Sequence, residues 1–197
     1  LNSRLQTMIR LRLDSQLLSG NGTSPNLEGI LDAGKSSVGS SDHNSYSGNL
    51  GRIGSVYNAI TDIRVNAFTE PDAIIMHPND WAQIVTQVDV DFQGTASAGL
   101  AAKRGVFTTA GGYGGGVANQ LWGLNVIPTT AMPANTVLVG KFGGGEAAHV
   151  VMRQGMDIAV SDSHGDNFTK NIMVIRATMR VGFPVYRQAA FHKITNM

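Results

Sequence analysis

Residues 171–191, NIMVIRATMRVGFPVYRQAAF, decide the fold. Their apolar side chains recur at every second position: Met173, Ile175, Ala177, Met179, Val181 and Phe183. Successive side chains of a strand point to opposite faces, so this period of two predicts one long strand with a buried face. Gly182 and Pro184 indicate a bend near its end. Arg176 and Arg180 share the opposite face, where they could anchor an anion or meet acidic groups of this chain or a neighbour.

Other strand patterns precede this stretch. They cover residues 121–128, 136–142, 147–153 and 156–163. Short apolar runs separated by turn residues are typical of antiparallel strands joined by short connections. The second half of the chain is therefore predicted to be mostly antiparallel sheet.

The first half has helical periodicity. Leu1, Leu5, Ile9, Leu13 and Leu17 are spaced by four residues, which predicts an amphipathic helix that ends at Gly20-Asn21-Gly22. No capping residue precedes Leu1, so we expect the natural protein to extend further at this end. With the strands that follow, this helix makes the fold class α+β.

Three further elements follow in the first half. A second helix is predicted from about residue 50 to 68, and a short buried strand over 73–77. Pro78 then begins a third helix, whose apolar face is Trp81, Ile84, Val85 and Val88. Residues 19–48 and 89–120 are rich in glycine and small polar residues, and we interpret them as loops, the second long and flexible.

Composition excludes several classes of protein. The chain has 15 basic and 14 acidic residues, a net charge of +1 and no cysteine. Disulfides and thiolate metal sites are excluded, and the basic excess of a nucleic-acid binder is missing. No apolar run is long enough to span a membrane, and no signal peptide is recognisable. Charged residues make up 15% of the chain, against about 25% in ordinary soluble domains, which favours surfaces covered by partners.

One segment matches the phosphate-binding loop pattern. In GILDAGKS, residues 29–36, the four fixed positions are Gly29, Gly34, Lys35 and Ser36. That pattern binds phosphate when a buried strand precedes the loop and a helix follows it. GNGTSPNLE before the loop is no strand, and SVGSSDHNSYSGN after it is no helix. A nucleotide hydrolase acting through Gly29–Ser36 therefore stays only a distant alternative.

The remaining reactive side chains form no recognisable site. The five histidines are His43, His77, His149, His164 and His192, and no two have metal-ligand spacing. For His77, at the end of a predicted strand, a local structural role is expected. No G-x-S-x-G motif is present. Asp89 and Asp91 are interpreted as residues of a solvated loop. The sequence thus predicts no catalytic, cofactor-binding or metal-binding residue.

Four segments, in order along the chain, resemble the tailed-phage major capsid protein family with the Hong Kong 97-like fold. LLSGNGTSPNLEGIL (17–31) is similar to the end of a family helix, and IIMHPNDWAQI (74–84) to a strand and helix start. Residues 121–142 resemble a W-G-L block, with Asn125 where proline is usual. Residues 153–191 resemble the terminal strands, with Gln188 where proline is common.

The resemblance implies a domain organisation. Residues 1–24 would be the spine helix and its turn, part of the peripheral domain. Residues 25–135 would form mainly the axial domain. Residues 136–197 would supply the peripheral-domain strands and return to the axial domain. The family's N-terminal arm and extended loop would be absent from this chain.

The resemblance also implies a function without catalysis or cofactor. Copies of the chain, as pentamers and hexamers, would build an icosahedral shell around DNA for a tailed bacteriophage or prophage. Scaffolding, portal and decoration proteins would be further partners, packaged DNA would be contacted only non-specifically, and no membrane would be involved. The protein would be made in the cytoplasm of a bacterial host and reside in the virion capsid. An encapsulin-like nanocompartment shell and a generic soluble binding domain remain open as alternatives.

One family member cross-links its subunits by joining a lysine of the extended loop to an asparagine, with a nearby glutamate as the catalytic residue. Asn171 falls on the asparagine position, and Thr178 replaces the glutamate. A threonine cannot accept a lysine proton as a carboxylate does. We therefore expect no autocatalytic cross-linking, and expect Asn171 to be an ordinary strand residue.

Overall fold

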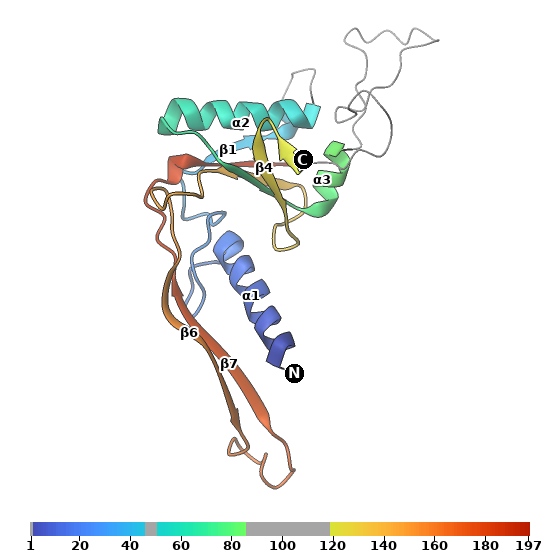
Figure 1. Ribbon diagram of the computed structural model, residues 1–197, viewed down its shortest axis with the longest axis vertical. Coiled ribbons are helices and arrows are strands. Elements are labelled where there is room, and N and C mark those ends of the chain that lie inside the picture. Colours follow the sequence, from blue (N-terminus) through green and yellow to red (C-terminus); the bar gives the residue numbers. More distant parts are fainter. Residues whose placement is uncertain (1, 46–50, 86–118) are drawn as a thin grey trace, which may run out of the picture. The chain divides into compact units, whose positions relative to one another are not determined.

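The computed structural model describes residues 2–45, 51–85 and 119–197, and the chain forms two compact units (Figure 1). Unit 1 consists of Leu1–Asp32 and Ala148–Val185, and unit 2 of Ala33–Ala147 and Tyr186–Met197. Each unit is therefore assembled from segments far apart in the sequence. Both units combine helix with strand, which confirms the α+β class.

Helix α1 (Asn2–Ser19) of unit 1 ends where its sequence predicts. The N–H of Gly20 donates to the carbonyl of Gln16 at 3.0 Å, and a Cβ on Gly20 would lie 2.2 Å from the carbonyl oxygen of Leu27. Only glycine lets the chain fold back so closely on the helix end. The helix face predicted to be apolar is the less exposed one, with the buried Leu18 beside it.

Strands β6 (Val151–Ser161) and β7 (Val174–Gly182) form an antiparallel two-stranded sheet in unit 1, the long hairpin (Figure 1). The two strands expected over 147–153 and 156–163 are one strand, interrupted by register shifts around Gln154. Such bulges bend a strand without ending it.

The predicted burial of one strand face is wrong for the outer part of β7. Ala177, Met179 and Val181 are half-buried, but Ile175 is 37% exposed and Met173, just before the strand, 72%. The alternation is real, but within the described residues of unit 1 only two strands pair, and α1 is the one helix that packs on β7. A ribbon of two strands has too little surface to bury a face by itself.

Unit 2 contains a six-stranded sheet with the order β1-β8-β5-β2-β4-β3. Its strands are β1 (Gly39–Asp42), β2 (Ala73–Met76), β3 (Gln120–Leu121), β4 (Leu124–Pro128), β5 (Thr136–Gly140) and β8 (Phe191–Thr195). The β1–β8 and β2–β4 pairs are parallel, and the other pairs are antiparallel. The sheet is thus mixed, but both of its parallel pairs include a strand of the first half, and the pairs between strands of the second half are antiparallel, as the sequence predicted.

Helix α2 (Gly51–Ala67) lies along this sheet (Figure 1) and buries Val56, Ala59, Ile60 and Ile63. The central strand β5 is buried at Val137, Leu138 and Val139. Helix α3 (Pro78–Val85) begins at the predicted proline and buries Trp81 and Ile84. Two short 3-10 helices, His43–Ser45 and Gln188–Ala190, complete the unit.

Three expectations for unit 2 need correction. The loop expected over 19–48 contains β1, and the stretch predicted as a strand over 183–190 is not strand before β8 begins. The single strand expected over 121–128 is interrupted by a tight turn between β3 and β4, at which Trp122 and Gly123 have positive φ values of 54° and 78°. Val88 and nearly all of the loop predicted over 89–120 lie outside the described residues.

Candidate functional site

A serine, a histidine and an aspartate meet in unit 2, which sequence reasoning did not anticipate. Nε2 of His192 lies 3.0 Å from Oγ of Ser41, and its Nδ1 lies 3.6 Å from a carboxylate oxygen of Asp62. The histidine thus lies between a serine and an aspartate, as in a hydrolase triad, in which the histidine takes the serine proton. The parallel pairing of β1 with β8 brings them together across 151 residues of sequence.

The geometry of this cluster is structural rather than catalytic. His192 is only 3% exposed, so a substrate has no access to its ring. A Cβ on Gly39 would lie 2.3 Å from Nδ1, which means that the ring packs directly on β1. The distance to Asp62 is too long for a hydrogen bond. Burial lowers the pKa of His192 and Asp62 opposes this, so the neutral ring joins β1 to β8.

Two further histidines of unit 2, His43 and His77, make contacts of their own. Nδ1 of His43 lies 3.2 Å from Oγ of Ser55, and burial, assisted by Arg52, lowers the pKa of His43. Nδ1 of His77 accepts the N–H of Asn79 at 3.2 Å, a local contact of the kind expected for it. Across residues 2–45, 51–85 and 119–197, no three His, Asp or Glu side chains are grouped to hold a metal ion.

The segment that matches a phosphate-binding loop has no free cradle of N–H groups at its start. The N–H of Gly29 donates to the carbonyl of Gly20 at 2.9 Å, and the N–H of Ile30 to that of Leu17 at 3.0 Å. The next regular element is strand β1, where a phosphate loop requires a helix. These bonds fasten residues 29–31 to the end of α1, so the segment has a structural role.

Asn171 is not an ordinary strand residue, and that expectation is corrected. It lies in the turn before β7 with a φ of 54°, a conformation that asparagine tolerates better than most residues. Thr178 is exposed in the middle of β7 and pairs with Asp157 of β6.

Exposed apolar side chains are concentrated on the long hairpin and its tip. Those exposed by more than half are Met152, Val160, Phe168 and Met173. Phe168 is 78% exposed, an unusual state for a side chain that gains about 2 kcal/mol from burial. A concentration of exposed apolar side chains is typical of a surface that contacts other polypeptides.

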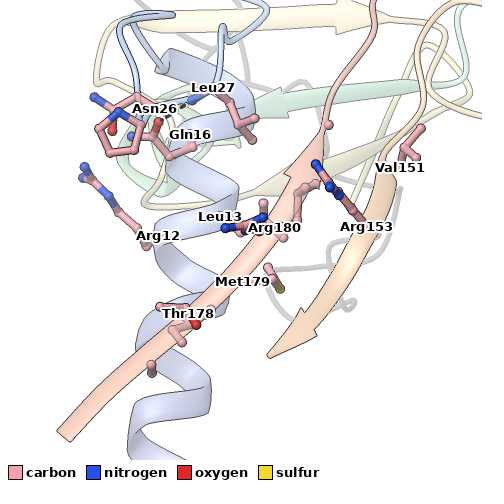
Figure 2. A pocket seen from close by; sticks show the side chains of 15 residues that line it. Arg12, Leu13, Gln16, Asn26, Leu27, Val151, Arg153, Thr178, Met179 and Arg180 are labelled. Carbon is pink, nitrogen blue, oxygen red and sulfur yellow. Dashed lines mark hydrogen bonds between the residues drawn. The ribbon is translucent and has the colours of Figure 1, made fainter. Parts of the chain in front are cut away.

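A groove of about 880 Å³ runs between α1, the segment that follows it and the long hairpin, all within unit 1 (Figure 2). Its charged side chains are Arg12 on α1, Arg153 on β6 and Arg180 on β7, and none of the described acidic residues lines it. We name it the arginine groove. Only Arg180 had been singled out from the sequence.

An aromatic pair stands on the surface of unit 2. The ring centroids of Tyr57 and Trp122 are 4.9 Å apart, and the indole N–H of Trp122 donates to the carbonyl of Ile53 at 3.1 Å. Both rings are nearly half exposed.

No helix in the described ranges combines the length and apolar character needed to cross a bilayer.

Comparisons with known proteins show which family the sequence is similar to. A family model described as the phage capsid family matches residues 1–196. The chain is 31% identical over 201 residues to the major capsid protein of Enterobacteria phage HK97, a match that covers 99% of this chain and 45% of that protein. The chain thus spans less than half the length of this relative.

Two solved structures have similar folds. The capsid of an empty GTA particle has a TM-score of 0.67 at 17% identity, over 99% of this chain and 66% of the other. A structure of Microbacterium phage Oxtober96 has a TM-score of 0.67 at 11% identity, over 97% of this chain and 62% of the other. At these identities the likeness concerns the fold alone.

Proposed function

Because this chain belongs to the phage capsid family, we propose that it forms the wall of a closed icosahedral shell, built from many copies of itself around the DNA of a tailed bacteriophage or prophage. The family resemblance drawn from four sequence segments is thereby confirmed, as is the Hong Kong 97-like fold. The observation that carries the proposal is the family match over residues 1–196.

The surface of the long hairpin supports a function through self-contact. Its exposed apolar residues would become buried between copies in a shell, and the low content of charged residues suits surfaces that are covered. In a closed lattice each contact can be modest, because the first contact raises the effective concentration for the next ones. Symmetric repetition then makes the whole assembly stable.

We further propose that unit 1 is the peripheral domain, with α1 as its spine helix, and that unit 2 is the axial domain. Pentamers and hexamers of copies would be the intermediates of assembly. Scaffolding, portal and decoration proteins would be additional partners, and packaged DNA would be contacted only non-specifically. The protein would be made in the host cytoplasm and reside in the virion capsid.

Electron microscopy of the full-length protein, expressed alone and purified, tests the shell. Closed particles of uniform diameter are the expected result. A protein that stays monomeric at all concentrations up to about 100 μM, where modest contacts become populated, would contradict the proposal.

The shell is also expected to lack covalent cross-links, because Thr178 has no carboxylate to accept a lysine proton. Asp157 pairs with Thr178 in the hairpin and is the nearest acidic position on the facing strand. Boiled shells should therefore run as monomers on a denaturing gel. Ladders of higher mass would overturn this expectation, and their loss in Asp157→Asn would identify the carboxylate responsible.

A further inference from the structure

The arginine groove combines three like charges that have no counter-charge. Arg12, Arg153 and Arg180 all line it, and among the described residues none of the three makes a hydrogen bond or ion pair (Figure 2). Within the described part of the chain, no aspartate or glutamate lines the groove. Guanidinium groups only donate hydrogen bonds, so the groove offers donors and positive charge to whatever enters it.

The remaining surface of the groove is largely apolar. Its apolar side chains include Ile9, Leu13, Leu27, Val151, Met179 and Val181. Two of the polar neighbours are already engaged, since Oε1 of Gln16 accepts the N–H of Leu27 at 3.1 Å and Nδ2 of Asn26 donates to Asn21 at 3.0 Å. A ligand for this groove therefore needs apolar groups together with acceptors of negative charge.

We propose that the arginine groove is a docking site for an acidic polypeptide segment in an extended conformation, whose carboxylates pair with the three arginines while its apolar side chains contact the wall. Carboxylate and guanidinium match as two parallel hydrogen bonds, which makes arginine well suited to this recognition. An extended segment presents acidic and apolar side chains to opposite sides at alternate positions, as the mixed lining requires.

Nucleic acid fits the groove less well. Phosphate backbones are bound by surfaces with a broad positive field, whereas this chain has a net charge of only +1. The apolar side chains of the groove would also gain no apolar contact from a phosphate backbone. Docking of an acidic segment is a function separate from building the shell. It can be measured on the isolated chain, and a negative result would leave the shell proposal intact.

The test is fluorescence anisotropy of the 197-residue chain with a labelled synthetic peptide of alternating aspartate and leucine. Two probes serve as controls: the same peptide with asparagine for aspartate, and a labelled oligothymidylate of equal charge. Saturable binding of the acidic peptide with a Kd of about 10–100 μM is expected, with little binding of either control. Binding should weaken as salt is added, because the arginines are exposed.

Variants connect the binding to the groove. The triple variant Arg12→Gln/Arg153→Gln/Arg180→Gln should bind the peptide at least tenfold more weakly, roughly the loss expected from one or two charge-assisted bonds. Arg176→Gln is the matched control, because Arg176 is exposed on the same strand but does not line the groove. Circular dichroism checks that each variant is folded.

Several outcomes would overturn the proposal. These are no saturable binding at about 1 mM chain, equal binding of the asparagine peptide, and equal losses in Arg176→Gln and the triple variant. Tighter binding of oligothymidylate would assign the groove to nucleic acid instead. Self-association of the chain that the triple variant abolishes, without peptide binding, would make a second copy the occupant.

Discussion

The two units of this molecule differ in how far they bury their apolar side chains. In unit 2, strands of a six-stranded sheet and helix α2 bury one another, and Phe191, Val137 and Leu138 are 0% exposed. In unit 1, the long hairpin pairs only with itself, and Met173 and Phe168 are more than 70% exposed. The core of unit 2 is thus buried within one chain, whereas the hairpin would be covered by other copies in the proposed shell.

The largest expected effect is on assembly, through the hairpin. Phe168→Asp places a charge where the proposed shell buries an aromatic ring, and loses about 2 kcal/mol of burial at every copy. A loss of this size corresponds to a roughly 30-fold weaker contact, and it is repeated throughout a lattice. Full-length Phe168→Asp protein should therefore give no closed particles by electron microscopy at concentrations where the parent protein assembles.

Phe68→Asp is the control for that variant. Phe68 is 88% exposed at the end of α2 in unit 2, so the same substitution adds the same charge outside the hairpin. Its particles should form normally. If both variants assemble equally well, the hairpin is not the contact surface.

The second prediction contrasts two phenylalanines in the isolated chain. Phe191 is fully buried in β8, and its ring lies 5.3 Å from that of Phe142. Phe191→Ala removes this packing and leaves a cavity, so the free energy of unfolding should fall by about 3–5 kcal/mol. Phe168→Ala removes an exposed ring and should change that free energy by no more than about 0.5 kcal/mol.

Urea unfolding followed by circular dichroism measures both changes. The denaturant midpoint should shift only for Phe191→Ala, with the slope of the transition unchanged in both variants. Comparable destabilisation by the two substitutions would mean that the hairpin tip has a packed environment within the monomer.

A third prediction makes the same comparison with glycines. A Cβ on Gly140 would lie 2.3 Å from Cδ1 of Phe191, whereas a Cβ on Gly155 of β6 would meet nothing within 4 Å. Gly140→Ala forces the buried ring to move and should lower the free energy of unfolding by about 1–3 kcal/mol. Gly155→Ala should stay within about 0.5 kcal/mol, and the same urea transitions report both values. If Gly140→Ala left the free energy of unfolding unchanged, the core of unit 2 would be loosely packed around Phe191.

The elements that the sequence predicts well are those with a local signal. Helix α2, the strand at Ala73–Met76 and the helix start at Pro78 each carry an apolar period or a capping signal within a few residues. Strand β1 has no such signal, because GSSD is short and polar and exists as a strand only by pairing with β8. The alternation of apolar side chains in β7 could be predicted from the sequence. Their burial could not, because it depends on what covers the strand.

The functional surfaces were predictable only in part. Arg180 stands out from the period of β7, but Arg12 and Arg153 join it only through the tertiary structure of unit 1. The contact of Ser41 with His192 likewise spans 151 residues and follows from a parallel strand pair that no short motif predicts. Family resemblance identified the fold without either contact, because it rests on contiguous segments.

The smallest expected effect is a pH dependence that belongs to unit 2. His192 is buried against Ser41, with Asp62 as the facing charged group, and its pKa is lowered from the ordinary value of 6.5. Below pH 6.5 the unfolded chain therefore binds a proton that the folded chain does not, so the stability of the folded chain decreases as the pH falls. His43, whose pKa is also lowered, acts in the same direction. Midpoints of urea unfolding between pH 7.5 and pH 5 should fall less steeply in His192→Gln than in the parent chain, because glutamine does not titrate. If instead the parent became more stable on acidification through this window, Asp62 would outweigh burial and His192 would be charged in the folded chain.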